Sequence, residues 1–309
     1  MVNKVKVFAP ATVANVGPGF DIFGMAIDHV GDELEVVIHD EPGIKINPIE
    51  GFENLPTDPE KNVVGVVAQA ILDKVNDNRG FEITIHKNVL PGSGLGSSAS
   101  SSAAAAYAAN HLLGSPFETN DLVEFAMQGE KAASGKAHAD NVAPSLLGGF
   151  TMIRSYKPLD VISVPYPSDI YITVIHPQIE IKTSDSKKIL KKEIMLDSAI
   201  QQWSNTAGLV LGLATSDYDL ISRSLTDVIV EPVRSVLIPC YDEVKNSAIE
   251  TGALGCSISG SGPSIFALSK GNQIAKEVAL AFESIYAKAG INNKIYISKI
   301  SDKGARLIN

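Results

Sequence analysis

The sequence predicts an α+β protein with two domains, and three observations support this class. The chain has 309 residues, more than a single hydrophobic core usually organises. Its strand-like and helix-like segments do not alternate as a doubly wound parallel sheet would require. Prolines cluster at Pro158, Pro165 and Pro167, which indicates a connection between domains. We therefore expect an N-terminal domain at residues 1–160 and a C-terminal domain at residues 161–309.

The N-terminal domain is expected to begin with a strand at Lys4–Phe8, where polar and apolar residues alternate. The next segment, Pro10–Asp21, contains too many glycines and prolines for a regular element. It would present Asn15 and Asp21 on a tight loop, although these residue types are also the commonest turn formers. Short strands should follow at Leu34–Ile38 and Ile44–Ile46.

A helix is expected to start at Asp58-Pro59, because aspartate is a favourable N-cap and proline suits the first helical position. Asn62 lies in its first turn and faces away from the buried side. That side is a stripe at spacing four, formed by Val63, Val67, Ile71 and Val75. Alternating apolar residues at 81–85 then predict a strand that leads into a glycine-rich stretch.

The glycine-rich stretch Pro91-Gly92-Ser93-Gly94-Leu95-Gly96-Ser97-Ser98 runs directly into an alanine-rich segment. Its three glycines allow positive φ angles and leave no Cβ in the way, so that consecutive N–H groups can converge on an anion. The alanines favour a helix, whose first turn has unpaired N–H groups and the positive end of the helix dipole. The stretch therefore predicts a binding site for the phosphates of a nucleotide.

Other interpretations of this stretch are weaker. A Walker P-loop needs Gly-Lys-Ser/Thr at its end, and no lysine lies between Lys87 and Lys131. Residues 94–99 fit the dinucleotide pattern G-x-G-x-x-G/A, but the second strand with an acid about 20 residues later is missing. A flexible linker is the third interpretation, and the helix that follows argues against it.

Two polar features follow the alanine-rich helix. A helix that begins at Asn120 carries Glu130 near its C-terminal end, where the helix dipole disfavours an acid. Either this helix continues or Glu130 has a function. A glycine-flanked segment then concentrates His138, Asp140 and Asn141 within four residues. The alternative interpretation of that segment is a capping loop with a surface histidine.

The second half contains a second glycine-rich loop, Ser259-Gly260-Ser261-Gly262, between two strands. Thr183 and Lys187 lie in a polar basic segment, and Arg234 lies near a break between helices. Such charged residues are usually solvated or locally ion-paired. Expected strands are Phe150–Ile153, Ile170–Ile175, Cys256–Ile258, Ser264–Leu268 and Lys294–Ile300, with helices up to about Ala214, Leu225 and Ile249 and at about Gln273–Ala289.

Composition limits the partners and the location of the protein. The net charge of −9 and the lack of a basic run argue against nucleic-acid binding. The longest segment without charged residues, Asn88–Phe117, is too rich in Ser, Gly, Asn and His to span a membrane. Cys240 and Cys256 are too few for a disulfide framework and favour a reducing compartment. We expect a cytoplasmic protein that binds neither nucleic acid nor membrane.

Several of these segments together resemble a known superfamily. In order and spacing, three of them are similar to motifs of the small-molecule kinases named for galactokinase, homoserine kinase, mevalonate kinase and phosphomevalonate kinase: Pro10–Asp21, Pro91–Ser100 and Gly255–Ser264. Four segments resemble the homoserine kinase family within it: Ala14–Gly24, His138–Pro144, Glu231–Arg234 and Ile258–Ser264. The resemblance extends over nearly the whole chain.

This resemblance implies a fold and a reaction. The N-terminal domain would contain sheet, helices and an uncommon left-handed βαβ crossover, and the C-terminal domain would be ferredoxin-like, with the active site between them. The γ-phosphoryl group of ATP would be transferred to the hydroxyl of L-homoserine, giving O-phospho-L-homoserine on the route to threonine. Because family members are often dimers, a homodimer is a further expectation.

The same resemblance implies roles for individual residues. The stretch Pro91–Ser98 would hold the triphosphate, Asn62 would lie near the adenine, and Ser98 with Glu130 would hold Mg²⁺. Residues 259–261 would close over the acceptor and over residues 92–96. Around homoserine, the family pattern places Asn15, Asp21, His138, Asn141, Thr183, Lys187 and Arg234.

The chemistry of the acceptor suits this set. Asp21 would bind the substrate ammonium, and cationic groups would bind its carboxylate. Lys187 stands where homoserine kinases commonly carry arginine, so the carboxylate contact would depend mostly on Arg234. Several superfamily members use an aspartate base near the position of Asn141, whereas an amide accepts no proton at neutral pH, and in the family pattern the adjacent Asp140 is not the base. Asn141 would then aim the hydroxyl, with catalysis by positioning and charge neutralisation.

Three alternatives stay open at this point. The nearest is another kinase of the same superfamily, for example one that acts on mevalonate. A ligand sensor without catalytic activity is a second, against which the retention of Ser98, Glu130, Asn141 and Arg234 argues. A dehydrogenase that binds a dinucleotide is the third.

Overall fold

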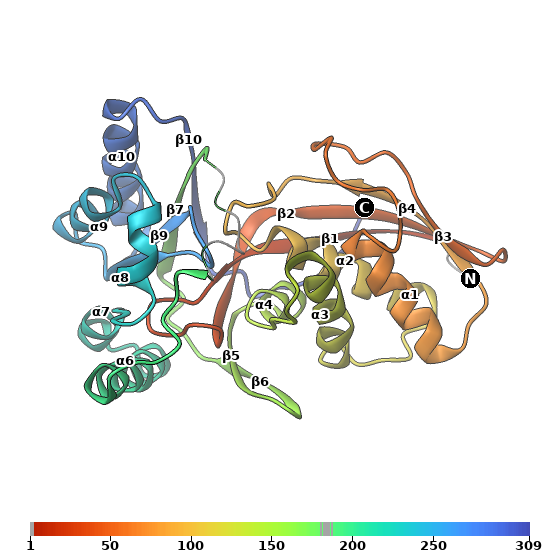
Figure 1. Cartoon of the computed structure of the whole chain (residues 1–309), viewed down its shortest axis with the longest axis horizontal. Helices are drawn as coiled ribbons and strands as arrows, with labels where there is room; N and C mark the ends of the chain where they lie inside the picture. Colours follow the sequence, from red (N-terminus) through yellow and green to blue (C-terminus); the bar gives the residue numbers. More distant parts are fainter. Residues whose placement is uncertain (1–2, 180, 182–185, 187) are drawn as a thin grey trace.

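A computed structural model describes residues 3–179, 181, 186 and 188–309. The described chain forms two sheets, each covered by helices (Figure 1). The larger sheet contains seven strands, β1 Lys4–Ala14, β2 Phe23–His39, β3 Gly43–Ile46, β4 Gly80–His86, β5 Phe150–Tyr156, β6 Leu159–Val164 and β11 Arg306–Ile308. Helices α1 Val63–Val75, α2 Ser97–Leu112 and α4 Val142–Leu147 lie against one face of it, and α3 Asp121–Ser134 packs on these helices.

The larger sheet has the strand order β11-β1-β2-β4-β3, and the hairpin of β5 and β6 extends from β2. Strands β3 and β4 are parallel neighbours joined by α1, so they form a βαβ unit. The hand of this crossover stays a prediction. All other pairs in the sheet are antiparallel, so the predicted α+β class is confirmed for the N-terminal half.

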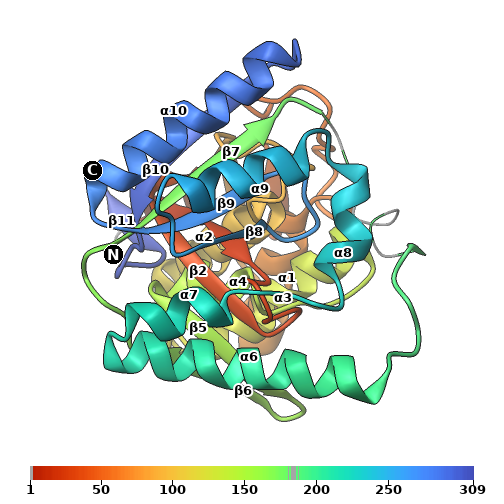
Figure 2. The same ribbon diagram turned by 90° about the vertical axis from the view of Figure 1, so that its left-hand side faces the viewer.

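The smaller sheet has four antiparallel strands in the order β10-β7-β9-β8. Its strands are β7 Ile170–Pro177, β8 Gly255–Ile258, β9 Ile265–Lys270 and β10 Asn293–Lys299. Helices α9 Tyr241–Glu250 and α10 Asn272–Lys288 pack side by side on it (Figure 2). This arrangement is the βαββαβ pattern of ferredoxin-like folds, as predicted. The remaining helical segments are α6 Leu196–Thr215, α7 Tyr218–Ser224, α8 Glu231–Arg234 and the 3₁₀ turn η1 Ser235–Leu237.

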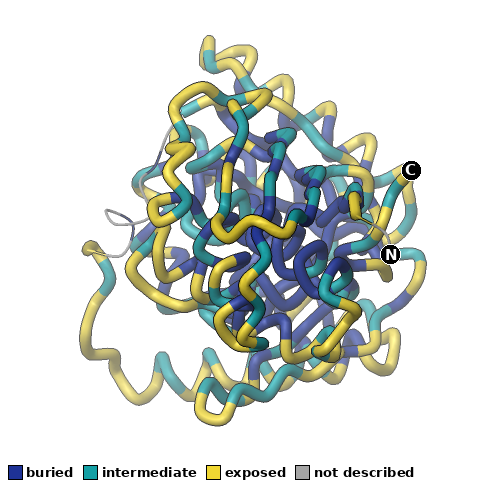
Figure 3. Tube along the Cα trace, turned by 90° about the vertical axis from the view of Figure 1, so that its right-hand side faces the viewer, coloured by how far each residue is buried: buried dark blue, intermediate teal, exposed yellow. Residues whose placement is uncertain are grey.

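Helix α2 lies in the centre of the N-terminal core. Nearly all of its side chains are buried, including those of Ser100, Ser101 and Ser102, and it contacts α1, α3, β1 and β2. A helix that is buried all round needs side chains that let neighbours approach closely, which its many alanines allow. Figure 3 shows the buried interior in dark blue, enclosed by exposed loops. The N-terminus of α2 is therefore held inside the molecule, where it faces the site.

Some local predictions were wrong, because pairing partners far along the chain decided the structure. Strand β1 continues through Pro10 to Ala14, where a loop was expected. The ladder with β2 shifts its register between Pro10 and Thr12 and then resumes, so that Thr12 pairs with Ala26. Proline is tolerated in a strand at such an irregularity. Strand β11 and the short helix α4 were also not predicted.

Helix α1 begins at Val63 instead of at Pro59. Its N-cap is Asn62, whose side-chain oxygen accepts from the backbone N–H of Val64 at 2.9 Å. Asp58 instead accepts from the N–H of Glu60 in a preceding turn, at 3.1 Å. The buried side accordingly includes Val64, Ala68 and Leu72 besides the predicted Val67 and Ile71, whereas Val63 and Val75 are half-buried.

The expected domain boundary at residue 160 falls inside β6, which pairs with β5 in the larger sheet. The C-terminal strand β11 also returns to that sheet and pairs with β1. Among the residues that the structure describes, no helix is long and apolar enough to cross a membrane.

Candidate active site

A cavity of about 670 Å³ brings the predicted site residues together. Its wall combines the glycine-rich stretch and α3 with residues from the segments that connect β7 to β8 and β8 to β9. The predicted residues that line it are Asn15, Asp21, Asn62, Pro91, Gly92, Gly94, Gly96, Ser97, Ser98, Glu130, His138, Asn141, Arg234, Gly260 and Ser261. Ser93, Leu95 and Ser259 are buried in the two glycine-rich loops and do not line it. Thr183 and Lys187 lie outside the described residues.

The two glycine-rich loops pack directly on each other. Gly94 has a φ of +80°, and a Cβ added there would lie 2.6 Å from the backbone oxygen of Ser259 and 2.8 Å from that of Gly262. The Ser259 hydroxyl in turn donates to the backbone oxygen of Gly94 at 2.7 Å. Only glycine permits this approach at this φ. The second loop therefore contacts the first, as predicted.

Helix α2 begins at Ser97 with Gly96 as its N-cap, and no side chain caps it. Its first-turn N–H groups and the positive end of its dipole therefore face the cavity, which Ser97 and Ser98 line. This geometry can bind an anion such as a phosphate group.

A buried ion pair lies at the base of the same loop. Lys87 Nζ contacts the carboxylate of Asp32 and donates to the backbone oxygen of Ser97 at 2.6 Å and to the Ser101 hydroxyl at 2.9 Å. The other carboxylate oxygen of Asp32 accepts from the N–H groups of Asn88 and Val89, each at 3.0 Å. Burial lowers the pKa of Lys87, and the Asp32 carboxylate opposes that shift. Sequence analysis missed this pair, because its members are far apart in the chain.

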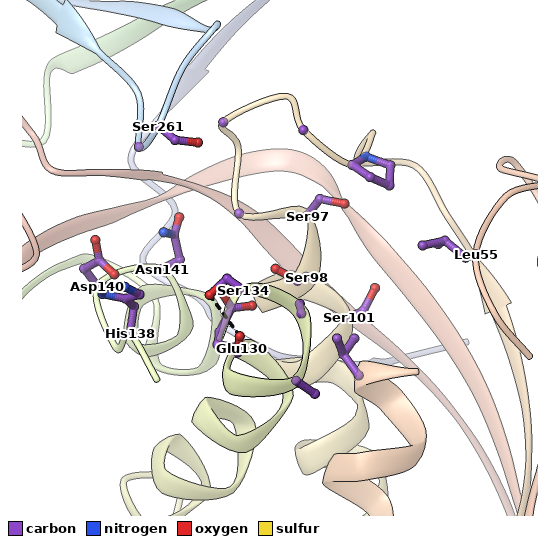
Figure 4. A pocket seen from close by; sticks show the side chains of 18 of the residues that line it. Leu55, Ser97, Ser98, Ser101, Glu130, Ser134, His138, Asp140, Asn141 and Ser261 are labelled. Atoms are coloured by element: carbon purple, nitrogen blue, oxygen red, sulfur yellow. Dashed lines mark hydrogen bonds between the residues drawn. The ribbon is translucent and has the colours of Figure 1, made fainter. Parts of the chain in front are cut away.

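Glu130 and Ser98 both line the cavity and carry side-chain oxygen atoms. Glu130 is buried near the end of α3, and Figure 4 shows its side chain close to Ser98 and Ser134. Mg²⁺ is bound by oxygen ligands and usually keeps only one or two protein carboxylates beside substrate phosphates. The described residues contain no cluster of three or more potential metal-binding side chains. A carboxylate and a hydroxyl beside an open helix N-terminus therefore fit a magnesium ion that arrives with a nucleotide.

At the other end of the cavity, Asp21 is held in place by its backbone. Its φ is +59°, its N–H donates to Asn15 Oδ1 at 3.0 Å, and its carbonyl accepts from the Tyr156 hydroxyl at 2.7 Å. His138 Nδ1 lies 3.4 Å from the Asp21 carboxylate. The backbone of Asp21 is therefore fixed, and its carboxylate lines the cavity, where it can bind a cation.

Arg234 approaches the same end from α8. It is only 3% exposed, its Nη1 donates to the backbone oxygen of Gly260 at 3.0 Å, and its guanidinium lies 5.1 Å from the centre of the Phe20 ring. Asn15 Nδ2 donates to the same Gly260 oxygen at 2.7 Å. Burial lowers the pKa of Arg234, with nearby carboxylates opposing the shift, and an arginine stays protonated in proteins.

Asp140 is an additional acid in this wall. It is 3% exposed, and its Oδ1 has no hydrogen-bond partner among the described residues. Burial, together with the charges of Asp21 and Glu130, raises the pKa of Asp140 to about 8. Its carboxyl group is therefore mostly protonated at pH 7. The sequence showed this acid beside Asn141 but not its burial.

Asn141 lies just before α4, and Figure 4 shows it beside Asp140 and His138. Its side-chain oxygen Oδ1 accepts from the hydroxyl of Thr12 at 2.7 Å. Thr12 is fully buried in β1, and its backbone N–H donates to the carbonyl of Leu95 at 3.1 Å. Thr12 was not among the predicted site residues. Its only sequence signal was its place in the segment before Asn15.

The chain matches two family models, GHMP kinases N terminal domain at residues 62–149 and GHMP kinases C terminal at residues 209–288. It is 45% identical to a homoserine kinase of Chlorobaculum tepidum, over 99% of both chains. It is 38% identical to a homoserine kinase of Pyrococcus abyssi, over 98% of this chain and 99% of the relative.

Solved structures agree with these matches. A crystal structure of homoserine kinase from Cytophaga hutchinsonii superposes with a TM-score of 0.97 at 49% identity, covering 100% of this chain and 98% of that one. Mevalonate kinase of L. major, at 16% identity and a TM-score of 0.73 over 97% of each chain, shares the fold. The predicted two-domain architecture is thereby confirmed. The chain belongs to the GHMP kinases and, within them, to the homoserine kinase family.

Proposed function

We propose that this protein transfers the γ-phosphoryl group of ATP to the side-chain hydroxyl of L-homoserine, giving O-phospho-L-homoserine for threonine biosynthesis. The observation that carries this proposal is a single cavity with an anion-binding helix N-terminus at one end and a fixed acid and a buried arginine at the other. Membership of the homoserine kinase family supports the choice of acceptor.

We assign the triphosphate to the glycine-rich stretch Pro91–Ser98 and the start of α2. The adenine would lie beyond it, against the part of the wall formed by Leu55, Pro56, Asn62 and Val63. Asn62 uses its amide to bind the Pro56 carbonyl at 2.7 Å and the N–H of Val64 at 2.9 Å. Its main contribution would therefore be to hold this wall in shape.

Ser98 and Glu130 would hold Mg²⁺ together with phosphate oxygens. When bound, the ion supplies positive charge to the β- and γ-phosphates, where negative charge accumulates during transfer. This assignment rests on the position of the two side chains in the cavity and on their oxygen chemistry.

L-Homoserine would bind at the opposite end of the cavity. The Asp21 carboxylate suits its ammonium group and Arg234 suits its carboxylate, since charge-assisted hydrogen bonds are the strong ones. Asn15 and His138 complete the described part of this subsite. We propose that Thr183 and Lys187 also contact the substrate near its carboxylate. Both lie outside the described residues.

The transfer itself needs positioning more than proton chemistry. The homoserine oxygen attacks the γ-phosphorus in line, the bond from that phosphorus to the β,γ-bridging oxygen breaks, and ADP leaves. The hydroxyl proton passes to a phosphoryl oxygen or to water. Because the transition state is loose, little covalent help from the protein is required. Asn141 orients the hydroxyl, and the helix N-terminus stabilises the phosphoryl oxygens.

The test is ATP-dependent phosphorylation of L-homoserine, compared with L-serine, L-threonine and mevalonate under the same conditions. Phosphorus NMR should show ADP and a phosphomonoester formed in equal amounts, with homoserine the preferred acceptor. Preference for mevalonate would favour another kinase of the superfamily. ATP binding without turnover of any acceptor would favour a sensor, and thermal stabilisation by NAD would favour a dehydrogenase.

A further inference from the structure

Thr12 connects three parts of the chain that are far apart in the sequence. Thr12 lies in β1, its backbone N–H binds the carbonyl of Leu95 in the glycine-rich stretch, and its hydroxyl binds Asn141 Oδ1 at the start of α4. The Thr12 side chain is completely buried, whereas Asn141 is half-buried and lines the cavity. One residue therefore joins the glycine-rich stretch, through its backbone, to Asn141, through its side chain.

The backbone of Gly96 packs against both Thr12 and Asn141. A Cβ at Gly96 would lie 2.1 Å from Thr12 Oγ1 and 2.8 Å from Asn141 Oδ1. The backbone at the start of α2 thus packs directly on the hydroxyl and the amide oxygen. Any side chain larger than glycine at this position would displace the hydroxyl or the amide oxygen.

The bond decides which end of the Asn141 amide is offered to a substrate. An amide accepts through its oxygen and donates through its nitrogen. Because Thr12 occupies Oδ1, the NH₂ group remains for the cavity, and Figure 4 shows it on the side of Asp140. With the opposite orientation, Asn141 would offer an acceptor to the substrate instead.

We infer that Thr12 is a positioning residue that fixes the Asn141 amide so that Asn141 donates a hydrogen bond to the acceptor hydroxyl oxygen. This inference rests on the proposed function and deepens it. A donated hydrogen bond aims an oxygen lone pair at phosphorus and leaves the hydroxyl proton free to leave toward the phosphoryl group. Asn141 then cannot act as the proton acceptor.

The first experiment replaces Thr12 by Val, which keeps the shape and the backbone bond to Leu95 but removes the hydroxyl. We expect kcat for homoserine to fall about tenfold or more, the size expected when a buried hydrogen bond is lost, with the KM for ATP nearly unchanged. Thr12→Ser, which keeps the hydroxyl, should restore most of the rate. Thr12→Ala serves the same purpose as Thr12→Val if the valine variant does not fold.

The matched control is Thr173→Val. Thr173 is also fully buried in a strand, β7, and its hydroxyl binds the backbone oxygen of Ala275 at 2.9 Å, away from the cavity. This variant should lose stability but keep its kcat. An equal fall of kcat in both variants would show a general packing effect and overturn the inference.

A double-mutant cycle and one further substitution test the orientation itself. In an Asn141→Ala background, Thr12→Val should have no further effect on kcat, because the amide that it positions is gone. Asn141→Asp should be nearly inactive, since a carboxylate held by Thr12 offers the acceptor only an oxygen. Retention of the wild-type rate by Asn141→Asp, or additive effects in the cycle, would contradict the inference.

An NMR measurement separates this inference from the proposed function. The side-chain NH₂ signal of Asn141, assigned by its loss in Asn141→Ala, should shift in Thr12→Val and return in Thr12→Ser without any substrate present. An unchanged signal in Thr12→Val would overturn the inference. Absence of homoserine phosphorylation by the wild-type enzyme would instead overturn the proposed function.

Discussion

Lys87 Nζ lies 2.6 Å from the backbone oxygen of Ser97 and so closes the base of the glycine-rich stretch. The hydroxyl of Ser97 reinforces this closure by donating to the carbonyl of Val89 at 2.7 Å. Lys87 is therefore a buried residue that links the end of β4 to the start of α2. It differs in this role from the lysine of a Walker loop, which contacts phosphates directly.

Replacement of Lys87 by Met should destabilise the protein strongly, because it leaves the Asp32 carboxylate buried without its cation. We expect a loss of about 3–5 kcal/mol in the free energy of unfolding, measured by urea denaturation. The double variant Lys87→Met/Asp32→Asn should recover part of that loss. Equal stability of Lys87→Met and wild type would contradict the buried pair.

Gly94→Ala should disrupt the contact between the two glycine-rich loops, because the new Cβ would meet the backbone oxygens of Ser259 and Gly262. We expect kcat/KM for ATP to fall about tenfold or more, since small displacements at a reacting site are costly. Gly114→Ala is the matched control. Gly114 has nearly the same φ, +84° against +80°, but nothing lies within 4 Å of its Cβ position. It should lose about 1 kcal/mol of stability and no activity.

Glu130→Gln should raise the Mg²⁺ concentration needed for half-maximal activity by about tenfold or more, because an amide is a weaker ligand for Mg²⁺ than a carboxylate. The measurement is initial rate against free Mg²⁺ at saturating ATP. Glu124→Gln, an exposed residue on the same helix, should leave the curve unchanged. A shift of the same size in both variants would argue against a metal-binding role for Glu130.

Asp140 should make stability fall as pH rises. Its pKa is about 8 in the folded protein and 3.8 in the reference state, so between these values the folded state binds more protons than the unfolded state. The free energy of unfolding must then decrease with pH over this range. Asp140→Asn, which mimics the neutral acid, should remove this contribution.

The check is the melting temperature of wild type and Asp140→Asn from pH 5 to pH 9. The melting temperature of Asp140→Asn minus that of wild type should increase by roughly 2 °C from pH 5 to pH 9. For a chain of this size, this corresponds to at least about 1 kcal/mol in the free energy of unfolding. Asp197→Asn, at an exposed aspartate, should follow the wild-type curve. Parallel curves for Asp140→Asn and wild type would show that the Asp140 carboxyl is already ionised at pH 5.

Local patterns were sufficient for much of the fold, and they also predicted the glycine-rich stretch as a phosphate site. The three glycines and the alanine-rich helix were predicted from propensity alone, because positive φ and helix formation are properties of the residues themselves. All four strands of the smaller sheet were predicted from their local sequence. Strand β1 was predicted too short, because residues 10–14 join the sheet only through their partners in β2.

Local sequence patterns did not identify the residues at the acceptor end of the cavity. Asp21, Asn141 and Arg234 were proposed only through the family resemblance, because each alone has the composition of an ordinary turn or surface residue. The sequence places Asp140 beside Asn141, but no local pattern shows that its carboxyl is buried. Whether Lys187 replaces an arginine in carboxylate binding stays a prediction.

The residues alone therefore determined the class of the fold and the family, since these depend on short-range propensity and on motifs contiguous in the chain. They also predict an anion-binding loop, which stays a prediction. Only the tertiary structure decided how the loop is held and how the acceptor end is oriented. Lys87 meets Asp32, and Thr12 meets Asn141, across 55 and 129 residues of chain. Hydrogen bonds and ion pairs between such distant partners form only when packing brings the two groups within about 3 Å of each other, and burial then strengthens them.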